Sequence, residues 1–314
     1  MRALRSTGEQ LPQRRSESLP VGAAHGQQVE ASHVSPETSE PGWVKQAAAV
    51  IAGLHSEIAT VIRGKDEVIQ DFLTAIVAGG SILLEDLPGV GKTTLAKTFA
   101  RLVELKFERL QCTPDLLPAD AIGFSVYNAQ EGTFSFRPGP IFCNVLLVDE
   151  INRASPRTQS ALLESMAEGQ VTVEGESRQL AEPFFVNATQ NQTKFHATNH
   201  MPEAKLERFL FHLAIDYPDQ QSEIELLYNQ NSVARHEVNP ILTAQGLLEL
   251  QRQAQRVEVH HDLAEYIIRL VRATRNNDQI LIGCSPRGSQ MLFRASQAAA
   301  LVAGRPYVLP VDIQ

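Results

Sequence analysis

Two segments of the sequence carry charged and hydroxyl side chains at spacings that suit a phosphorylated ligand. The first lies between an apolar run and a helical pattern and contains Pro88, Gly89, Val90, Gly91, Lys92, Thr93 and Thr94. Glycines let a backbone curl so that successive N–H groups point at one anion. The N-terminus of the following helix adds partial positive charge. Lys92 would then reach the outer phosphates, and the Thr93 hydroxyl would bind Mg²⁺.

This loop departs at one position from the pattern G-x-x-x-x-G-K-[ST], because Asp86 stands where the first glycine is expected. Asp86 precedes the curl itself, so the part of the loop that would bind an anion is retained. A glycine-rich turn without a ligand is the alternative. The apolar run before the loop and the helical pattern after it favour phosphate binding.

The second segment is a run of four apolar residues, Val145–Val148, that ends in Asp149 and Glu150. Ligands of open α/β folds bind where such strands end. Asp149 would hold Mg²⁺ directly or through water, and Glu150 would orient and deprotonate an attacking water molecule. Taken alone, the pattern also fits a strand followed by an acidic helix cap.

The elements that must position these residues alternate between short apolar runs and helical patterns. Runs that are apolar on both faces are typical of a parallel sheet covered by helices on two sides, so an α/β fold is expected. The expected strands are Ile82–Leu84, Phe107–Cys112, Val145–Val148, Phe184–Val186 and Leu213–Ile215. Helices are expected over 43–61, 66–79, 92–104, 156–168 and 202–210. Residues 169–176 alternate and then turn at a glycine, which predicts a β-hairpin.

The composition divides the chain into three regions. Residues 1–42 contain no aromatic residue and few apolar ones, so a disordered tail is expected. Residues 43–217 hold the alternating pattern and are expected to form an α/β core. Strand signals then stop, and residues 218–314 are expected to form a helical domain. Its expected helices are 219–230, 242–256, 262–276 and 286–303.

Charge and cysteine content limit the partners and the compartment. The chain carries 28 Lys and Arg against 36 Asp and Glu, a formal net charge of −8. Duplex nucleic acid is therefore a poor candidate partner, because its binding relies on cations placed along phosphates. The three cysteines are far apart and odd in number, which favours a reducing compartment. No stretch has the apolar character of a signal peptide or a membrane span, so a cytoplasmic protein is expected.

Several longer motifs occur in a fixed order along residues 43–314. They are Thr113-Pro-Asp-Leu-Leu-Pro118, Arg137-Pro-Gly-Pro-Ile-Phe142, Asp149-Glu-Ile-Asn-Arg-Ala-Ser-Pro156, Thr158-Gln-Ser-Ala-Leu-Leu-Glu164, Ala188-Thr-Gln-Asn191, Leu206-Glu-Arg-Phe209 and Ser285-Pro-Arg287. In this combination the chain resembles the MoxR family of AAA+ ATPases. The resemblance implies a P-loop NTPase core with a C-terminal all-helical lid, which hydrolyses ATP with Mg²⁺ as a hexameric ring. The family continues with a further helix beyond the position of Gln314, so either a shortened lid or a fragment of a longer chain is expected.

The resemblance also implies roles for three more residues. Asn191 matches sensor 1, which would hydrogen-bond the attacking water or the γ-phosphate. Arg208 matches the arginine finger, presented to the nucleotide of the neighbouring subunit. Arg287 matches sensor 2, on the lid over the nucleotide of its own subunit. The alternatives are an Asn in a turn, a surface Arg beside Glu207 and an Arg at a helix start.

The implied biology is that of a chaperone that remodels, matures or activates a protein client, for example by metal insertion or complex assembly. A von Willebrand factor A-domain protein is the partner that the resemblance implies. The alternative is an AAA+ motor that acts on nucleic acid. Such a motor would need a basic hairpin facing the pore of the ring, and residues 169–176 carry only acidic charge.

Overall fold

The computed structural model describes residues 41–86, 90–190, 201, 203–217, 220–228 and 238–314. These residues belong to one compact unit, Glu40–Gln314. The predicted disordered tail over residues 1–42 lies almost wholly outside the described residues, so it stays a prediction.

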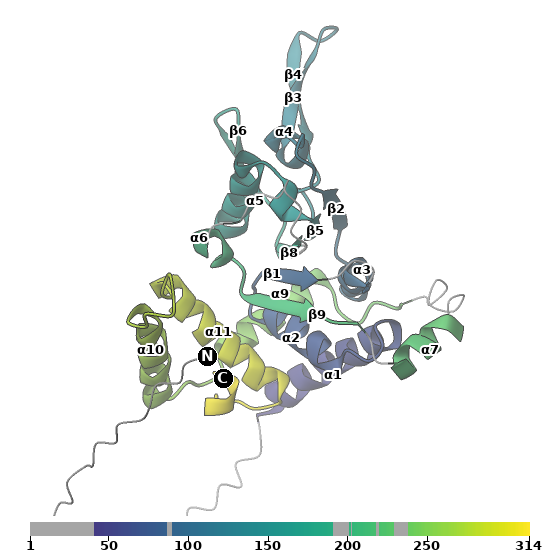
Figure 1. Cartoon of the computed structure of the whole chain (residues 1–314). Coiled ribbons are helices and arrows are strands. Elements are labelled where there is room, and N and C mark those ends of the chain that lie inside the picture. Colours follow the sequence, from purple (N-terminus) through teal and green to yellow (C-terminus); the bar gives the residue numbers. More distant parts are fainter. Residues whose placement is uncertain (1–40, 87–89, 191–200, 202, 218–219, 229–237) are drawn as a thin grey trace, which may run out of the picture. The chain divides into compact units, whose positions relative to one another are not determined.

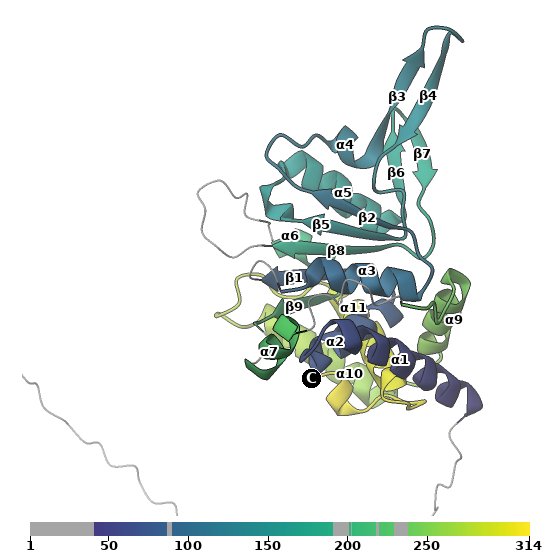
Figure 2. The same ribbon diagram turned by 90° about the vertical axis from the view of Figure 1, so that its right-hand side faces the viewer.

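The centre of this unit is a sheet of five parallel strands (Figure 2). The strands are β1 (Ile82–Asp86), β2 (Phe107–Gln111), β5 (Val145–Asp149), β8 (Phe185–Gln190) and β9 (Phe211–Ile215). Their order across the sheet is β2-β5-β8-β1-β9. Each strand overlaps one of the five apolar runs, so the predicted parallel α/β sheet is confirmed.

Successive residues of the central strands β1, β5 and β8 enter different cores, which explains why these runs are apolar on both faces. Ile82 and Leu84 of β1 belong to one buried cluster, whereas Leu83 between them belongs to the other. The first cluster includes helices α1 (Gly42–Val61), α2 (Asp66–Val77) and α3 (Lys92–Leu102). The second includes α4 (Pro118–Ile122) and α5 (Pro156–Glu168). The sheet is therefore covered on both sides.

The C-terminal part of the chain is helical, as expected. Its helices are α7 (Gln220–Tyr228), α9 (Ala244–Gln255), α10 (His261–Arg275) and α11 (Pro286–Val302) (Figure 1). Thr243 and Ser285 cap α9 and α11 with their side chains. Helix α11 packs against α2, α9 and α10. The domain boundary at residue 217 stays a prediction.

The helix expected over residues 202–210 is much shorter in the structure. Helix α6 covers only Glu203–Leu206, a turn follows, and β9 begins at Phe211 rather than at Leu213. The reason lies in tertiary contacts. Phe209 is buried in the second core cluster, and the Leu210 N–H donates to the Ser81 carbonyl beside β1. These contacts draw the chain into the sheet before the helix can continue.

Two hairpins extend from the α5 side of the sheet (Figures 1 and 2). The predicted one is confirmed as β6 (Gln170–Val173) and β7 (Glu176–Gln179). Glu174 and Gly175 both have positive φ, 54° and 85°, as a two-residue type I′ turn requires. The other hairpin, β3 (Gly123–Asn128) with β4 (Thr133–Pro138), was not predicted. Its strands bury few side chains, so they lack the apolar runs that marked the central strands.

Within the ranges that the structure describes, no helix is both long enough and apolar enough to cross a bilayer.

We expect Phe99→Ala to lower the free energy of unfolding by about 3–5 kcal/mol. Phe99 is fully buried and its ring lies edge-on to Phe72 of α2 and Phe185 of β8, at 5.4 and 6.5 Å between centroids. Urea unfolding followed by circular dichroism measures the change. The control is Phe134→Ala, which removes an exposed ring of β4 and should cost less than about 0.5 kcal/mol. Equal losses would contradict the assignment of Phe99 to the core.

Candidate functional site

The loop after β1 leads directly into α3, as the sequence predicted. Pro88 and Gly89 lie outside the described residues. Val90 and Gly91 come next, and Lys92, Thr93 and Thr94 form the half-buried first turn of α3. Gly91 has a φ of 95°, a left-handed conformation that favours glycine. A Cβ atom there would also lie 3.3 Å from Ile62, which follows α1. The positive φ and the close approach of Ile62 both explain why residue 91 is a glycine.

The start of α3 fits an anion. Gly91 is the N-cap residue, and since it has no side chain it cannot accept a hydrogen bond from the first-turn amides. Those amides are among the donors that a helix leaves without an intrahelical partner. With the helix dipole they make a favourable place for a phosphate group. This local geometry supports the predicted role of the loop.

The second predicted segment ends at the same edge of the sheet. Strands β1 and β5 are both parallel to β8, which lies between them. The carboxyl ends of all three therefore meet at one edge. That edge holds Asp149, the last residue of β5, and Glu150 after it, together with the loop that leads to Lys92. The structure thus brings together the two segments that the sequence singled out.

Asp149 is only 8% exposed and is held by a cation that the sequence analysis missed. The Nε of Arg109, on the neighbouring strand β2, donates to Asp149 Oδ2 at 2.6 Å. A buried carboxylate needs such a partner, because its transfer out of water is costly. Asp149 is a hard oxygen ligand of the kind that Mg²⁺ prefers. In the conformation described, one of its oxygens is engaged by Arg109.

Glu150 is also oriented by neighbouring side chains. Gln111 Nε2 donates to Glu150 Oε2 at 3.0 Å, and Arg153 NH1 donates to the same oxygen at 2.8 Å. Arg109 NH2 donates in turn to the side-chain oxygen of Gln111 at 3.1 Å. Hydrogen bonds through Arg109 and Gln111 of β2 therefore link the two carboxylates. A general base needs this kind of fixed orientation toward the atom from which it takes a proton.

The backbone at Glu150 is unusual and is supported by β8. Its φ is 55°, which is uncommon for a residue other than glycine. The Glu150 N–H donates to the hydroxyl oxygen of Thr189 at 2.8 Å, and that hydroxyl lies 3.4 Å from Asp149 Oδ1. Thr189 thus touches both members of the acidic pair. Strain of this kind persists where the surroundings fix it, and it concentrates at functional sites.

The negative charge at this edge of the sheet affects the pKa of a buried thiol. Cys112 follows β2 and is fully buried. Burial, and to a smaller extent the charges of Asp149 and Glu150, raise its pKa to about 12. The thiol therefore stays protonated at neutral pH, so we assign it no nucleophilic role.

The remaining predicted residues lie on three other segments. Asn191 follows β8 but lies outside the described residues. Arg208 is half-buried, and its guanidinium donates to the carbonyl oxygen of Leu163 on α5. Arg287 is exposed in the first turn of α11. Among the described residues, no hydrogen bond or ion pair joins Arg208 or Arg287 to the acidic pair.

The sequence analysis missed Arg109, Gln111 and Thr189. The period of a strand offers a signal for the first two, because side chains two residues apart share a face and 109 and 111 therefore share one face of β2. Finding their partners also requires the register, which places Gln111 opposite Asp149 and Val148 opposite Ala188.

Comparison with known proteins gives consistent matches. Residues 81–211 match the model of the ATPase family associated with various cellular activities, and residues 272–314 match an AAA lid domain. The chain is 46% identical to the uncharacterized protein YeaC of Bacillus subtilis, over 82% of this chain and 81% of that protein. It is 38% identical to chaperone MoxR1 of Mycobacterium tuberculosis, over 94% and 81%. A crystal structure from Cytophaga hutchinsonii, described as "a putative ATPase", shares 37% identity with a TM-score of 0.78, over 86% and 85%.

We expect Thr189→Val to lower the free energy of unfolding by about 1–2 kcal/mol, because it removes a buried hydroxyl and leaves the Glu150 N–H without its acceptor. Valine has nearly the same shape as threonine. Thr189→Ser is the matched control, since it keeps the hydroxyl and loses the methyl group. Urea unfolding of the three proteins measures the effect. A serine variant less stable than the valine variant would show that packing, not the hydrogen bond, is what matters at this position.

Proposed function

Because the chain belongs to the MoxR family of AAA+ ATPases, we propose that it hydrolyses ATP with Mg²⁺ as a hexameric ring. We further propose that it acts in the cytoplasm as a chaperone that remodels, matures or activates a protein client. Its proposed partner is a protein with a von Willebrand factor A domain. The observation that carries the proposal is the meeting of the Lys92 loop with Asp149 and Glu150 at one edge of the sheet.

The residues divide into groups with separate tasks. The loop from Pro88 to Thr94 would cradle the phosphates with backbone N–H groups, and Lys92 would neutralise their charge. Thr93 and Asp149 would hold Mg²⁺, which when bound supplies charge neutralisation at the phosphates. Glu150 would accept the proton of the attacking water. The proposed roles of Asn191, Arg208 and Arg287 remain those of sensor 1, arginine finger and sensor 2.

The contacts around the carboxylates support these tasks. Gln111 and Arg153 both hold the Oε2 atom of Glu150, and the Oε1 atom would take the proton of a water molecule. Arg109 lies on Asp149 and would share this carboxylate with the metal or move aside. Thr189 fixes the backbone between the two acids. The arrangement is therefore built to position a base, which agrees with hydrolysis better than with a purely structural nucleotide site.

We expect Glu150→Gln to lower ATP turnover by about 10²–10³-fold while nucleotide binding changes by less than about twofold. The reason is that glutamine keeps the hydrogen bonds of the side chain but cannot accept the proton. Steady-state phosphate release and titration with a fluorescent nucleotide measure the two properties. Lys92→Ala is the comparison, since it should weaken binding itself. Equal turnover in the wild type and Glu150→Gln would remove the proposed mechanism.

The unpredicted hairpin β3–β4 supports a polypeptide client. Tyr127 and Phe134 pair across its strands with ring centroids 5.1 Å apart, and they are 56% and 74% exposed. Phe136, further along the same face, is half-buried against Phe142. Exposed aromatic pairs of this kind commonly mark contact surfaces. The hairpin β6–β7 has no aromatic residue in its sequence, and β3–β4 supplies two exposed ones.

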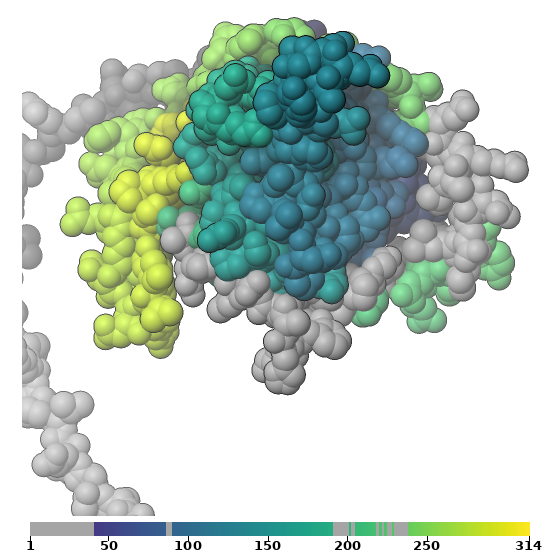
Figure 3. All heavy atoms as spheres, turned by 90° about the horizontal axis from the view of Figure 1, so that it is seen from above, coloured from purple at the N-terminus to yellow at the C-terminus, as the bar shows by residue number. Residues whose placement is uncertain are grey.

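The surroundings of the aromatic pair favour protein over single-stranded nucleic acid. Figure 3 shows the two hairpins next to one another, and the Ser125 N–H of β3 donates to Glu174 at the tip of β6–β7. Glu174 brings negative charge to β3 at Ser125, two residues before Tyr127. Arg178 is paired with Glu176 at 2.5 Å. Bases also stack on aromatic rings, but their binding depends on cations along the backbone.

We expect a permanently unfolded polypeptide, such as reduced and carboxymethylated α-lactalbumin, to stimulate ATP turnover. The double variant Tyr127→Ser with Phe134→Ser should raise the concentration for half-maximal stimulation by about fivefold or more, because two exposed rings are lost. Tyr228→Ser is the control, since it removes an exposed tyrosine of α7. Stimulation by single-stranded DNA, lost at higher salt, would favour the nucleic-acid motor instead.

A further inference from the structure

The segment Lys205–Phe209 lies between α5 and the start of α11. Lys205 Nζ donates to the Pro156 carbonyl at 3.4 Å and lies 3.2 Å from Ser160 Oγ, both on α5. Arg208 donates to the carbonyl oxygen of Leu163, also on α5. The side chains on either side of Glu207 thus fix this segment to one helix of the core.

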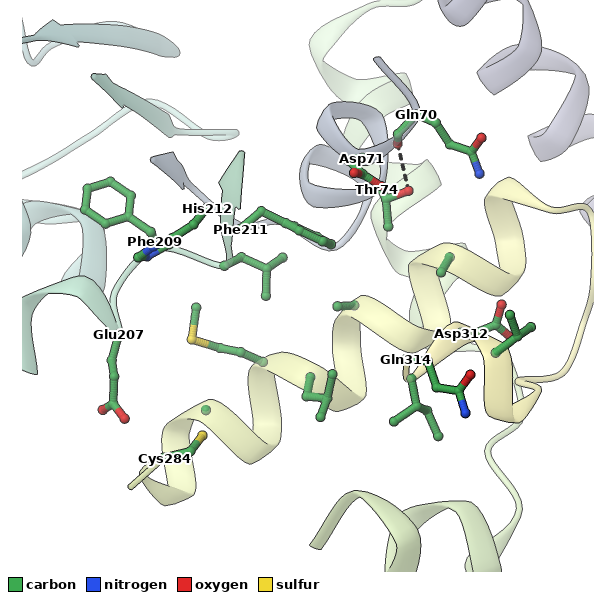
Figure 4. A pocket seen from close by; sticks show the side chains of 18 of the residues that line it. Gln70, Asp71, Thr74, Glu207, Phe209, Phe211, His212, Cys284, Asp312 and Gln314 are labelled. Atoms are coloured by element: carbon green, nitrogen blue, oxygen red, sulfur yellow. Dashed lines mark hydrogen bonds between the residues drawn. The ribbon is translucent and has the colours of Figure 1, made fainter. Parts of the chain in front are cut away.

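Glu207 points the other way and contacts the lid helix. Its Oε1 accepts a hydrogen bond from the Ser285 N–H at 2.8 Å. Figure 4 shows the carboxylate of Glu207 directed toward the end of α11 that carries Cys284. Ser285 is the N-cap residue of α11, and its own hydroxyl accepts from the Gly288 N–H at 3.4 Å. Glu207 therefore supplies an additional acceptor at the start of this helix.

The electrostatics of the contact are favourable. Helix α11 has 17 residues, and its N-terminus carries partial positive charge that a carboxylate stabilises. Glu207 is also close enough to affect Cys284, whose pKa is raised first by burial and then by the charge of Glu207. Hydrogen bonds from backbone N–H groups to a carboxylate are stronger than bonds between neutral groups. The contact is thus able to hold the two segments together.

The hydrogen bond between Glu207 and Ser285 lies close in sequence to both Arg208 and Arg287. Glu207 immediately precedes Arg208, and Ser285 is separated from Arg287 by one residue. Arg208 would act on the nucleotide of a neighbouring subunit, and Arg287 would act on that of its own subunit. The Glu207–Ser285 hydrogen bond joins two segments that are 78 residues apart in sequence. It is a direct connection between the segment that carries the proposed arginine finger and the segment that carries the proposed sensor 2.

We propose that Glu207 is a positioning residue that couples the lid arginine Arg287 to the segment carrying Arg208. The proposal rests on the proposed ATP hydrolysis. When nucleotide binding moves the first turn of α11, the Glu207 carboxylate transmits that movement to the turn that ends at Phe209. Because Arg208 is anchored on α5, the same contact also carries changes at a neighbouring subunit back to the lid.

The test measures ATP turnover and nucleotide binding for Glu207→Ala and Glu207→Gln in the full chain. We expect Glu207→Ala to lower kcat about tenfold, with nucleotide affinity changed by less than about twofold, because a charged hydrogen bond is lost away from the binding loop. Glutamine keeps an oxygen that accepts from Ser285, so Glu207→Gln should recover kcat to within about twofold of the wild type. Glu249→Ala is the matched control, since it removes an exposed carboxylate with one salt-bridge partner, Arg252 on α9, and should leave kcat unchanged.

A second arm places Glu207→Ala in an Arg287→Ala background. If Glu207 acts through the lid arginine, its removal there should cost less than about twofold, since coupled residues are not additive. A full tenfold loss in that background would overturn the proposal, as would a glutamine variant as impaired as the alanine variant. Hydrogen exchange at the Ser285 amide gives an independent readout and should be faster in Glu207→Ala. Unchanged exchange there would also overturn the proposal.

Failure of Glu207→Ala to fold and absence of ATP turnover in the wild type have separate meanings. If Glu207→Ala does not fold, Glu207→Asp tests the same contact, since it keeps the charge but draws the oxygens away from Ser285. It should lose kcat, and wild-type activity in Glu207→Asp would count against the proposal. Absence of Lys92-dependent ATP turnover in the wild type is a different result. It would remove the proposed function itself, and the coupling with it, whatever the Glu207 variants show.

Discussion

The parallel pairing of β1, β8 and β5 is the constraint on which the rest of the site depends. Parallel strands end at one edge, so the loop after β1 and the two acids after β5 must meet there. The pairing in turn depends on burial of both faces of the sheet. Ile82 and Leu84 pack into one core and Leu83 into the other, which makes a shift of register by one residue costly.

The acidic edge brings two carboxylates next to one another, and the protein compensates for this with positive charge and backbone support. Arg109 approaches Asp149, Arg153 approaches Glu150, and the hydroxyl of Thr189 supports the backbone between the acids. Without such partners the burial of Asp149 would cost free energy, because a buried charge needs an opposite charge or hydrogen bonds to compensate for lost hydration. The same contacts that stabilise the fold therefore keep the site ready for chemistry.

The net charge of −8 has different consequences in different parts of the molecule. Between the hairpins, Glu174 accepts a hydrogen bond from the N–H of Ser125, two residues before the exposed Tyr127. At the start of α11, Glu207 places its charge at a helix N-terminus. One carboxylate thus joins the two hairpins, and the other connects two segments of the chain. The total charge of the sequence could exclude duplex nucleic acid as a main partner, but it could not distinguish these two uses.

The sequence by itself determined the strands of the sheet, the loop from Val90 to Thr94 and the acidic end of β5, because each depends on a local pattern of residue types. It also marked the hairpin β6–β7 through its alternation and Gly175. Only the tertiary structure decided which side chains touch the acids, since Arg109 and Asp149 are 40 residues apart and meet through the register of β2 with β5. It likewise ended α6 at Leu206, where burial of Phe209 outweighs helical propensity, and it joined Glu207 to Ser285. Contacts between distant segments depend on how the chain packs, and no local pattern records them.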